Sequence, residues 1–351
     1  MRWRVFLLYT FIFPARLCWS ASGTEGASFL DIPVGGAPAA LGSAYTAQAN
    51  DAYAPVWNPA GLGFLHTVEF AGMHLSYIGP IHYEYAGLVV PFGKDREGEL
   101  GPAGLGVSIQ YLGTGDLDAR DINGIPDTPF TSAFGSYSLA YGQKIGDQFS
   151  LGATAKVIKE RIADASASAF GTDFGLMYRP DSTLSLGTVL ANLGSGVRFV
   201  NESDPLPLAI RFGGTCQLTP RWDISAEGVY RKTGLLSGGV GLEWRYGQNF
   251  SFRGGYNTAH IKELGAASGV TAGLGLFFWG QEFAYAWVPV GDLGQTHYFS
   301  IVFRLSSSPR PDKPRLKTPE YEDLEDMKID EPNRHEKLFD LLKDDDGKPL
   351  E

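Results

Sequence analysis

Ten residues alternate without a break in the stretch Gln148-Phe149-Ser150-Leu151-Gly152-Ala153-Thr154-Ala155-Lys156-Val157, with apolar side chains on one face and small or polar ones on the other. The stretches Glu69–Tyr77 and Phe299–Leu305 alternate in the same way. Period two predicts a β-strand, and runs of this length suit tilted strands that cross a membrane. We count fourteen such segments, an even number, which is typical of single-chain bacterial barrels. The sequence therefore predicts an all-β fold, a fourteen-stranded antiparallel outer-membrane β-barrel over residues 66–305.

The lengths of the connections favour this barrel over a soluble β-sandwich. Turns after even-numbered strands are short, as at Gly146-Asp147, whereas several connections after odd-numbered strands are long: Gly113 to Ser132, Asn192 to Pro207 and Asn257 to Gly269. Bacterial barrels place short turns in the periplasm and long loops outside the cell. An even strand count then predicts that both termini are periplasmic. The predicted strands are 68–78, 81–92, 103–112, 133–145, 149–162, 169–178, 184–191, 208–217, 222–231, 235–244, 250–256, 270–278, 283–288 and 296–305.

Composition agrees with a barrel and argues against a nucleic-acid partner. The 351 residues include 45 glycines, aromatics reach 13% and charged residues only 19%, as expected for strands with small residues at bends and rings at membrane interfaces. The formal net charge is −10, and an acidic chain repels nucleic acid. Beyond the N-terminus no apolar run is long enough for a helical span. Cys216 would stand alone in the mature chain, so we expect no internal disulfide.

The two ends of the chain differ from the predicted barrel. Residues 1–20 begin with Met1-Arg2-Trp3-Arg4 and continue with a short apolar run, a pattern that predicts a cleaved secretory signal. Residues 306–351 contain 14 acidic and 9 basic residues and form a predicted acidic periplasmic tail. Asp330-Glu331-Pro332 predicts the start of a short helix in that tail. Its apolar side chains either dock on a partner or belong to a partly disordered tail.

Residues 21–65 do not alternate and predict a plug, or hatch, inside the barrel. They are rich in Ala and Gly, which permit close packing in a confined space, and Pro38 lies in the first turn of a predicted short helix. Asn58 precedes Pro59 and is a natural N-cap for a second short turn. We expect Asn58, Pro59, Ala60 and Gly61 to shape this hatch.

Charged residues on the inward faces of the strands predict ion pairs in the lumen. Each lies between apolar residues that face outward, and counting from the turns brings opposite charges near one another. We favour a structural role for these pairs over a role in gating. The predicted pairs are Lys156 with Asp173, Arg211 with Glu227, and Glu243 with Arg253.

Several other residues are candidates for a metal site or a catalytic site. His74, His82 and Glu84 are predicted to face inward near the first hairpin, but a fourth ligand for a metal is missing. The sequence lacks a Gly-x-Ser-x-Gly motif, and no His lies in a nucleophile motif. We therefore expect no catalytic centre, no metal site and no cofactor. The aspartates between Gly113 and Ser132 predict a solvated polar loop, with a cargo-contact surface or a calcium site as alternatives.

The hatch motifs carry a resemblance to a known family. Ala49-Asn50-Asp51-Ala52 and Trp57-Asn58-Pro59-Ala60-Gly61-Leu62 resemble the N-terminal hatch signature of the PorV/PorQ family, which is related to FadL-type outer-membrane transporters. Over residues 27–305 the resemblance implies an accessory barrel of type IX-like protein secretion, in contact with outer-membrane lipid and with secreted cargo proteins or envelope subunits. The alternatives are a FadL-like transporter for hydrophobic small molecules and a structural envelope barrel.

Overall fold

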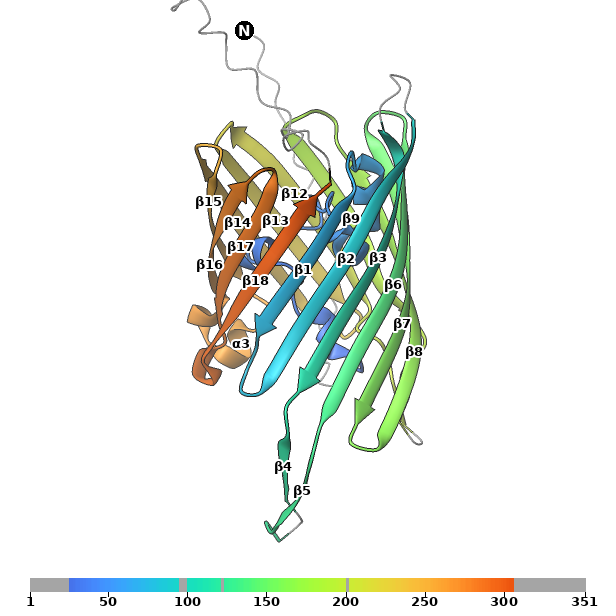
Figure 1. The fold of residues 1–351 in the computed structure, drawn as a ribbon, viewed down its shortest axis with the longest axis vertical. Helices are drawn as coiled ribbons and strands as arrows, with labels where there is room; N and C mark the ends of the chain where they lie inside the picture. The colour runs from blue at the N-terminus through green and yellow to red at the C-terminus, as the bar shows by residue number, and fades with distance from the viewer. Residues whose placement is uncertain (1–24, 95–99, 121–122, 200–201, 306–351) are drawn as a thin grey trace, which may run out of the picture. The chain divides into compact units, whose positions relative to one another are not determined.

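The computed structural model describes residues 25–94, 100–120, 123–199 and 202–305 (Figure 1). The predicted signal peptide and the predicted tail lie outside these residues. Short helical segments are η1 (Ser28–Asp31), α1 (Gly36–Ala40), α2 (Ala54–Trp57), η2 (Pro59–Phe64), α3 (Ile261–Leu264), η3 (Ala266–Gly269) and η4 (Gly291–Leu293). The strands are β1 (Glu69–Ser76), β2 (Ile81–Lys94), β3 (Leu100–Thr114), β4 (Leu117–Arg120), β5 (Pro126–Phe130), β6 (Ser132–Ile145), β7 (Phe149–Ile162), β8 (Ala165–Tyr178), β9 (Leu184–Gly194), β10 (Val197–Phe199), β11 (Glu202–Asp204), β12 (Ala209–Thr219), β13 (Trp222–Arg231), β14 (Leu236–Tyr246), β15 (Phe250–Asn257), β16 (Val270–Phe278), β17 (Gln281–Pro289) and β18 (Gln295–Arg304).

Fourteen of these strands form one closed barrel, so the predicted fold class is confirmed. Each barrel strand pairs antiparallel with its neighbours, and β1 pairs with β18 to close the sheet. Closure leaves no open sheet edge, which a membrane does not tolerate. Among the described residues no helix is both long and apolar enough to cross a membrane.

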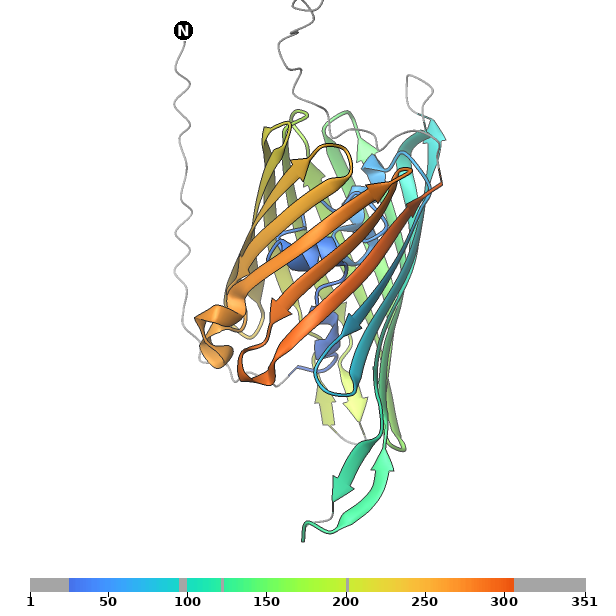
Figure 2. The same cartoon turned by 60° about the vertical axis from the view of Figure 1, so that its left-hand side comes forward.

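The connections divide between the two rims as predicted. One rim, the short-turn end, joins β6 to β7 through residues 146–148 and β12 to β13 through residues 220–221. The opposite rim, the long-connection end, carries residues 115–131, 195–208 and 258–269. The first of these differs from the predicted loop, because β4 and β5 pair as a hairpin that projects beyond the barrel (Figures 1 and 2).

Side chains alternate between an apolar outer face and an inner face that carries both polar and apolar residues. On β13, Ile224 and Tyr230 are exposed, whereas Asp223 and Glu227 are buried inside. This inside-out pattern is the one expected of a membrane barrel. Paired aromatic rings gather on the outside near the short-turn end, as membrane-interface belts do: Phe149 with Tyr178, and Trp222 with Trp244.

The prediction that His74, His82 and Glu84 face inward is wrong. In β1 the buried residues are Ala71, Met73 and Leu75, so His74 takes the outward parity. His74 Nδ1 lies 2.7 Å from Glu84 Oε1, and these side chains are 53% and 42% exposed. His74 faces outward because successive residues of a strand alternate between the two faces, so a shift of one residue moves every side chain to the opposite face.

The segment before β1 runs through the interior of the barrel (Figure 2). It starts at the long-connection end, where Gly26 N–H donates to the Pro205 carbonyl. It reaches the short-turn end at Leu65 and continues there into β1. The first described residues therefore lie at the opposite rim from Arg304, the last residue of β18.

A buried ion pair joins the first and last barrel strands. Glu69 of β1 is the cross-strand partner of Arg304 of β18, and Arg304 Nε lies 3.2 Å from Glu69 Oε1. Arg304 also approaches Glu282 of β17 at 3.6 Å. A buried arginine between two carboxylates stabilises the closing strands as long as both partners remain charged and paired.

Arg304→Ala is expected to weaken barrel closure. It leaves Glu69 buried with less compensating charge, and losing one partner of a buried pair costs about 3–5 kcal/mol. Urea unfolding of the detergent-solubilised protein, followed by tryptophan fluorescence, measures the loss. Lys262→Ala, at an exposed position, serves as the control and should change stability by less than about 0.5 kcal/mol. Equal unfolding midpoints for the two variants would contradict this role of Arg304.

Candidate functional site

The hatch lies directly on the inner wall because the wall presents glycines to it. A Cβ atom on Gly142 would lie 2.3 Å from the Pro59 carbonyl oxygen, and one on Gly239 would lie 2.1 Å from the Gly42 oxygen. Such distances exclude any side chain. The same close approach to hatch atoms occurs on nine strands, at Gly87, Gly104, Gly106, Gly142, Gly152, Gly175, Gly187, Gly239, Gly241, Gly255 and Gly273.

Between the glycines, polar wall side chains hydrogen-bond the hatch backbone. Ser150 Oγ donates to the Ala60 carbonyl at 2.6 Å, and the Tyr85 hydroxyl donates to the Ala52 carbonyl at 2.6 Å. The hatch has little regular structure, so its buried carbonyls need partners outside the segment. Further bonds of this kind join Thr154 to Pro55, Ser185 to Ala47, and Thr271 to Ala40.

Asn58 organises the turn that the sequence singles out. Its Oδ1 accepts from Ala60 N–H at 3.1 Å, so it is the N-cap of η2, and its Nδ2 donates to the Thr46 carbonyl at 2.9 Å. Pro59 occupies the first position of η2. A Cβ on Gly61 would lie 1.4 Å from the Ala49 carbonyl oxygen. Asn58, Pro59, Ala60 and Gly61 therefore join two parts of the hatch to each other and to the wall.

Arg211 and Glu227 do not form the predicted ion pair. The cross-strand partner of Arg211 is Val229, two residues from Glu227. Glu227 instead accepts the backbone N–H groups of Tyr45 and Thr46 at 2.9 and 2.8 Å.

Arg211 has a different partner from the hatch. Its guanidinium carbon lies 5.4 Å from the centre of the Trp57 ring, within range of a cation–π contact. Trp57 in turn donates its indole N–H to the Val34 carbonyl. The two wall charges that the sequence paired with each other both hold the hatch.

Lys156 and Asp173 are brought together, with a third member that sequence reasoning missed. Lys156 Nζ lies 2.7 Å from Asp173 Oδ2 and donates to Asn192 Oδ1 at 2.8 Å. Asn192 N–H donates to Asp173 Oδ1. Asn192 has φ +61°, and the β8–β9 register shifts beside Asp173. This buried triad therefore stabilises a β-bulge in the barrel wall.

Glu243 and Arg253 are also brought together, as part of a longer chain of charges. Arg253 Nε lies 2.7 Å from Glu243 Oε2, and Arg253 Nη2 lies 2.7 Å from Glu282 Oε1. Acidic and basic groups alternate along this lumenal charge chain, which runs from β13 to β1 through Asp223, Arg245, Glu243, Arg253, Glu282, Arg304 and Glu69. The inward parity of these residues was readable from the sequence, but their order around the barrel was not.

A buried acid links two turns of the hatch next to this chain. The Tyr45 hydroxyl donates to Asp51, and Asp51 Oδ1 accepts from Tyr53 N–H at 2.9 Å. Burial raises the pKa of the Asp51 carboxyl and raises that of the Tyr45 phenol well above its usual value. The Tyr45 proton therefore stays on the phenol at neutral pH and keeps the two turns together.

The long-connection half of the lumen is apolar on the β1–β8 side. Phe29 of η1 packs against Phe134 of β6 with ring centres 6.1 Å apart. Tyr83 and Ile158 are completely buried in the same cluster. Leu206, from the connection between β9 and β12, is also part of it. This end of the lumen is thus an apolar compartment filled by the start of the hatch.

The barrel wall has a step beside this compartment. Toward the long-connection end, the pairing of β8 with β9 stops at Gly171 and Gly194. The strand β8 extends six residues further in that direction, to Ala165. On its other side β9 pairs with β12 only as far as Ala191 and Ala209. Leu206 lies at the step, with its Cδ1 3.2 Å from where a Cβ of Gly171 would be. The described parts of the connection, residues 195–199 and 202–208, therefore occupy the place where β9 would have to be longer for the wall to reach its full height.

These features define a hatch-closed barrel of the outer-membrane type. Residues 21–201 match the model of the Uncharacterised protein family (UPF0164), and the chain belongs to that family. No curated protein sequence matches the chain.

Solved barrels share the fold at low sequence identity. The toluene transporter TbuX of Ralstonia pickettii is 16% identical with a TM-score of 0.55, covering 77% of this chain and 96% of its own. A FadL homologue of Pseudomonas aeruginosa is 12% identical with a TM-score of 0.52, covering 77% and 98%. The monoaromatic hydrocarbon channel CymD is 14% identical with a TM-score of 0.51, covering 77% and 96%. The fold is therefore FadL-like; the finer resemblance to PorV and PorQ has no counterpart among these structures.

Gly61→Ala is expected to loosen the hatch without unfolding the barrel. The new methyl group would overlap the Ala49 carbonyl, and such overpacking typically costs about 1–3 kcal/mol. Hydrogen exchange measured by mass spectrometry should show faster exchange across residues 36–65. Gly228→Ala is the matched control, because a Cβ there meets no atom within 4 Å. The prediction fails if both variants exchange like the wild type.

Glu227→Leu is expected to release the middle of the hatch, whereas Glu227→Gln should not. Leucine leaves two buried N–H groups without an acceptor, at about 1–3 kcal/mol each, while the glutamine oxygen still accepts both. Amide exchange of Tyr45 and Thr46 is the measurement. Arg211→Gln should leave those two amides protected. If the two amides exchanged as fast in Arg211→Gln as in Glu227→Leu, the result would support the Arg211–Glu227 ion pair expected from the sequence.

Proposed function

We propose that the protein is an outer-membrane channel that passes apolar small molecules between its lumen and the membrane. The observation that carries the proposal is the apolar compartment around Phe29 and Tyr83, which lies directly beside the step in the wall at Gly171. An apolar compartment suits a hydrophobic solute. A side exit at the step would let that solute enter lipid without crossing water.

Residues 202–208, which precede β12, act as the closure of this exit. Leu206 fills the step from inside, and Asn192 Nδ2 holds the connection by donating to the Pro207 carbonyl at 3.1 Å. The Lys156–Asp173–Asn192 triad thereby stabilises the β-bulge next to the step in the wall. In this proposal the long-connection end faces outside the cell.

The FadL-like relatives support this reading over secretion support. The three barrels named above are a toluene transporter, a FadL homologue and a monoaromatic hydrocarbon channel. The alternative reading of the sequence, a transporter for hydrophobic small molecules, thus gains support that secretion of cargo proteins lacks. We expect no catalytic activity, because the charged residues of the lumen are engaged with the hatch and with one another.

Uptake of radiolabelled toluene tests the proposal. Cells that produce the barrel should take up toluene faster than cells without it, with no gain for radiolabelled xylose. Leu206→Trp adds bulk at the step and should abolish the gain, whereas Leu236→Trp, at a position 77% exposed on the rim, should preserve it. Heat-modifiable gel migration confirms that each variant folds.

Two results would count against the proposal. One is equal toluene uptake with and without the barrel. The other is unchanged uptake by a folded Leu206→Trp variant, which would exclude the step as the exit. Recovery of secreted proteins after mild cross-linking, together with no uptake difference, would instead support the secretion reading.

A further inference from the structure

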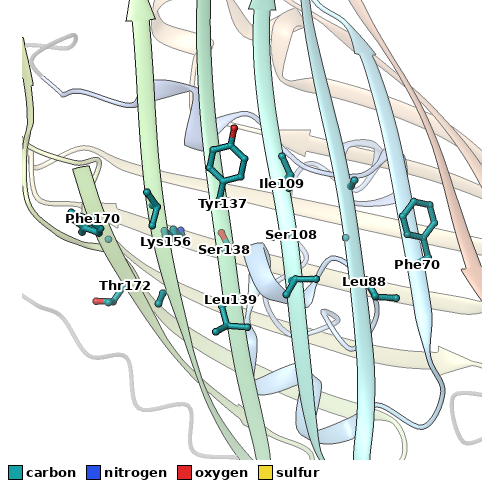
Figure 3. A pocket seen from close by; sticks show the side chains of 16 residues that line it. Phe70, Leu88, Ser108, Ile109, Tyr137, Ser138, Leu139, Lys156, Phe170 and Thr172 are labelled. Atoms are coloured by element: carbon teal, nitrogen blue, oxygen red, sulfur yellow. The ribbon is translucent and has the colours of Figure 1, made fainter. Parts of the chain in front are cut away.

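An apolar groove with a volume of about 630 Å³ runs across the outer wall from β8 to β1 (Figure 3). Its two sides are neighbouring rows of directly paired residues that face outward. Figure 3 shows Tyr137 and Ile109 along one side, and Leu139 and Leu88 along the other. The side nearer the long-connection end is Phe170, Val157, Tyr137, Ile109 and Ala86. The other side is Thr172, Ala155, Leu139, Val107, Leu88 and Phe70.

The floor of the groove is backbone. It is formed by the row between the two sides, in which Lys156, Ser138 and Ser108 turn their side chains inward, away from the groove. Gly171 and Gly87 continue this row at its ends. Small outward side chains such as Ala155 keep the groove open.

The dimensions of the groove select a chain-like occupant. Six strands at their usual spacing span about 24 Å. The volume then corresponds to a mean cross-section of about 26 Å², close to that of one alkyl chain. The β7–β8 turn extends further toward the long-connection end than the β1–β2 turn does (Figure 1). A chain that enters over β7 therefore goes deeper into the membrane as it approaches β1.

Two cationic side chains lie on β7, beside the groove and close to its β8 end. Along the outward face of β7, Val157 is followed by Lys159 and then Arg161, and both cationic side chains are exposed. Their cross-strand neighbours on β8 are Ser168 and Ser166, which leave room around them. Neither cation has an ion-pair partner among the residues that the structure describes. The outer face thus changes from apolar to cationic within one step along β7.

We propose that this groove binds a phospholipid of net negative charge, with one acyl chain between the two apolar rows and the uncompensated phosphate on Lys159 and Arg161. The charges are complementary, because Lys and Arg both bind phosphate oxygens through charge-assisted hydrogen bonds. The spacing also fits, because the headgroup and the start of the chain meet adjacent outward positions of one strand. This lipid site goes beyond the proposed transport and does not depend on it.

Native mass spectrometry of the purified barrel tests the site. The probe is an equimolar mixture of dioleoyl phosphatidylglycerol and dioleoyl phosphatidylcholine, which differ only in headgroup. Two interfacial cations should give the wild type a preference of about 30-fold for phosphatidylglycerol. Lys159→Gln combined with Arg161→Gln should remove that preference. Ala155→Phe narrows the groove and should reduce retention of both lipids.

Matched variants separate this site from general effects. Lys232→Gln with Lys262→Gln removes two exposed cations elsewhere on the long-connection end and should keep the preference. Ala272→Phe adds the same bulk as Ala155→Phe on the outward face of β16 and should keep retention. Equal retention of both lipids by the wild type, an unchanged preference after loss of Lys159 and Arg161, or displacement of the lipid by inorganic phosphate alone would each overturn the proposal.

Discussion

The contact between the hatch backbone and the glycine-lined wall is the constraint on which the rest of the interior depends. A segment of about forty residues crosses the lumen with only short helical turns, so most of its peptide groups have no partner within the segment. Burying them unpaired would cost more than a small barrel can offset. Wall glycines bring the strands close enough for Ser150, Thr154 and Tyr85 to reach the hatch carbonyls. Many of the 45 glycines thus serve hatch packing rather than bends in the strands.

The same constraint explains what the lumenal charges do. Glu227 binds two hatch N–H groups, Arg211 covers Trp57, and Arg231 of β13 contacts Asp31 at the start of the hatch. The lumenal charge chain from Asp223 to Glu69 lines the wall near the short-turn end and includes the pair that closes the barrel. These groups are engaged in structure, whereas the apolar cluster around Phe29 and Tyr83 fills the lumen near the long-connection end.

The sequence predicted the strands well because alternation is a local property that each strand carries by itself. The predicted β7 runs over 149–162, and the structure has Phe149–Ile162. Contacts across the barrel were harder to predict. The Arg211–Glu227 pair failed because the partner of Arg211 is Val229, two residues from Glu227, and because the sequence gives no sign that the hatch supplies a better donor. Glu69 and Arg304 were missed because they are 235 residues apart and only closure brings them together.

A tightly held hatch and a transport function are compatible if the hatch is not the part that moves. Its contacts spread over nine strands, so releasing it as a unit would break many bonds at once. Residues 205–208 are attached through single hydrogen bonds, such as Gly26 N–H to the Pro205 carbonyl and Lys232 N–H to the Leu208 carbonyl. Segments with few contacts open first. In the proposed channel, opening there would connect the apolar compartment with the membrane rather than with the periplasm, a route that favours solutes that dissolve in lipid.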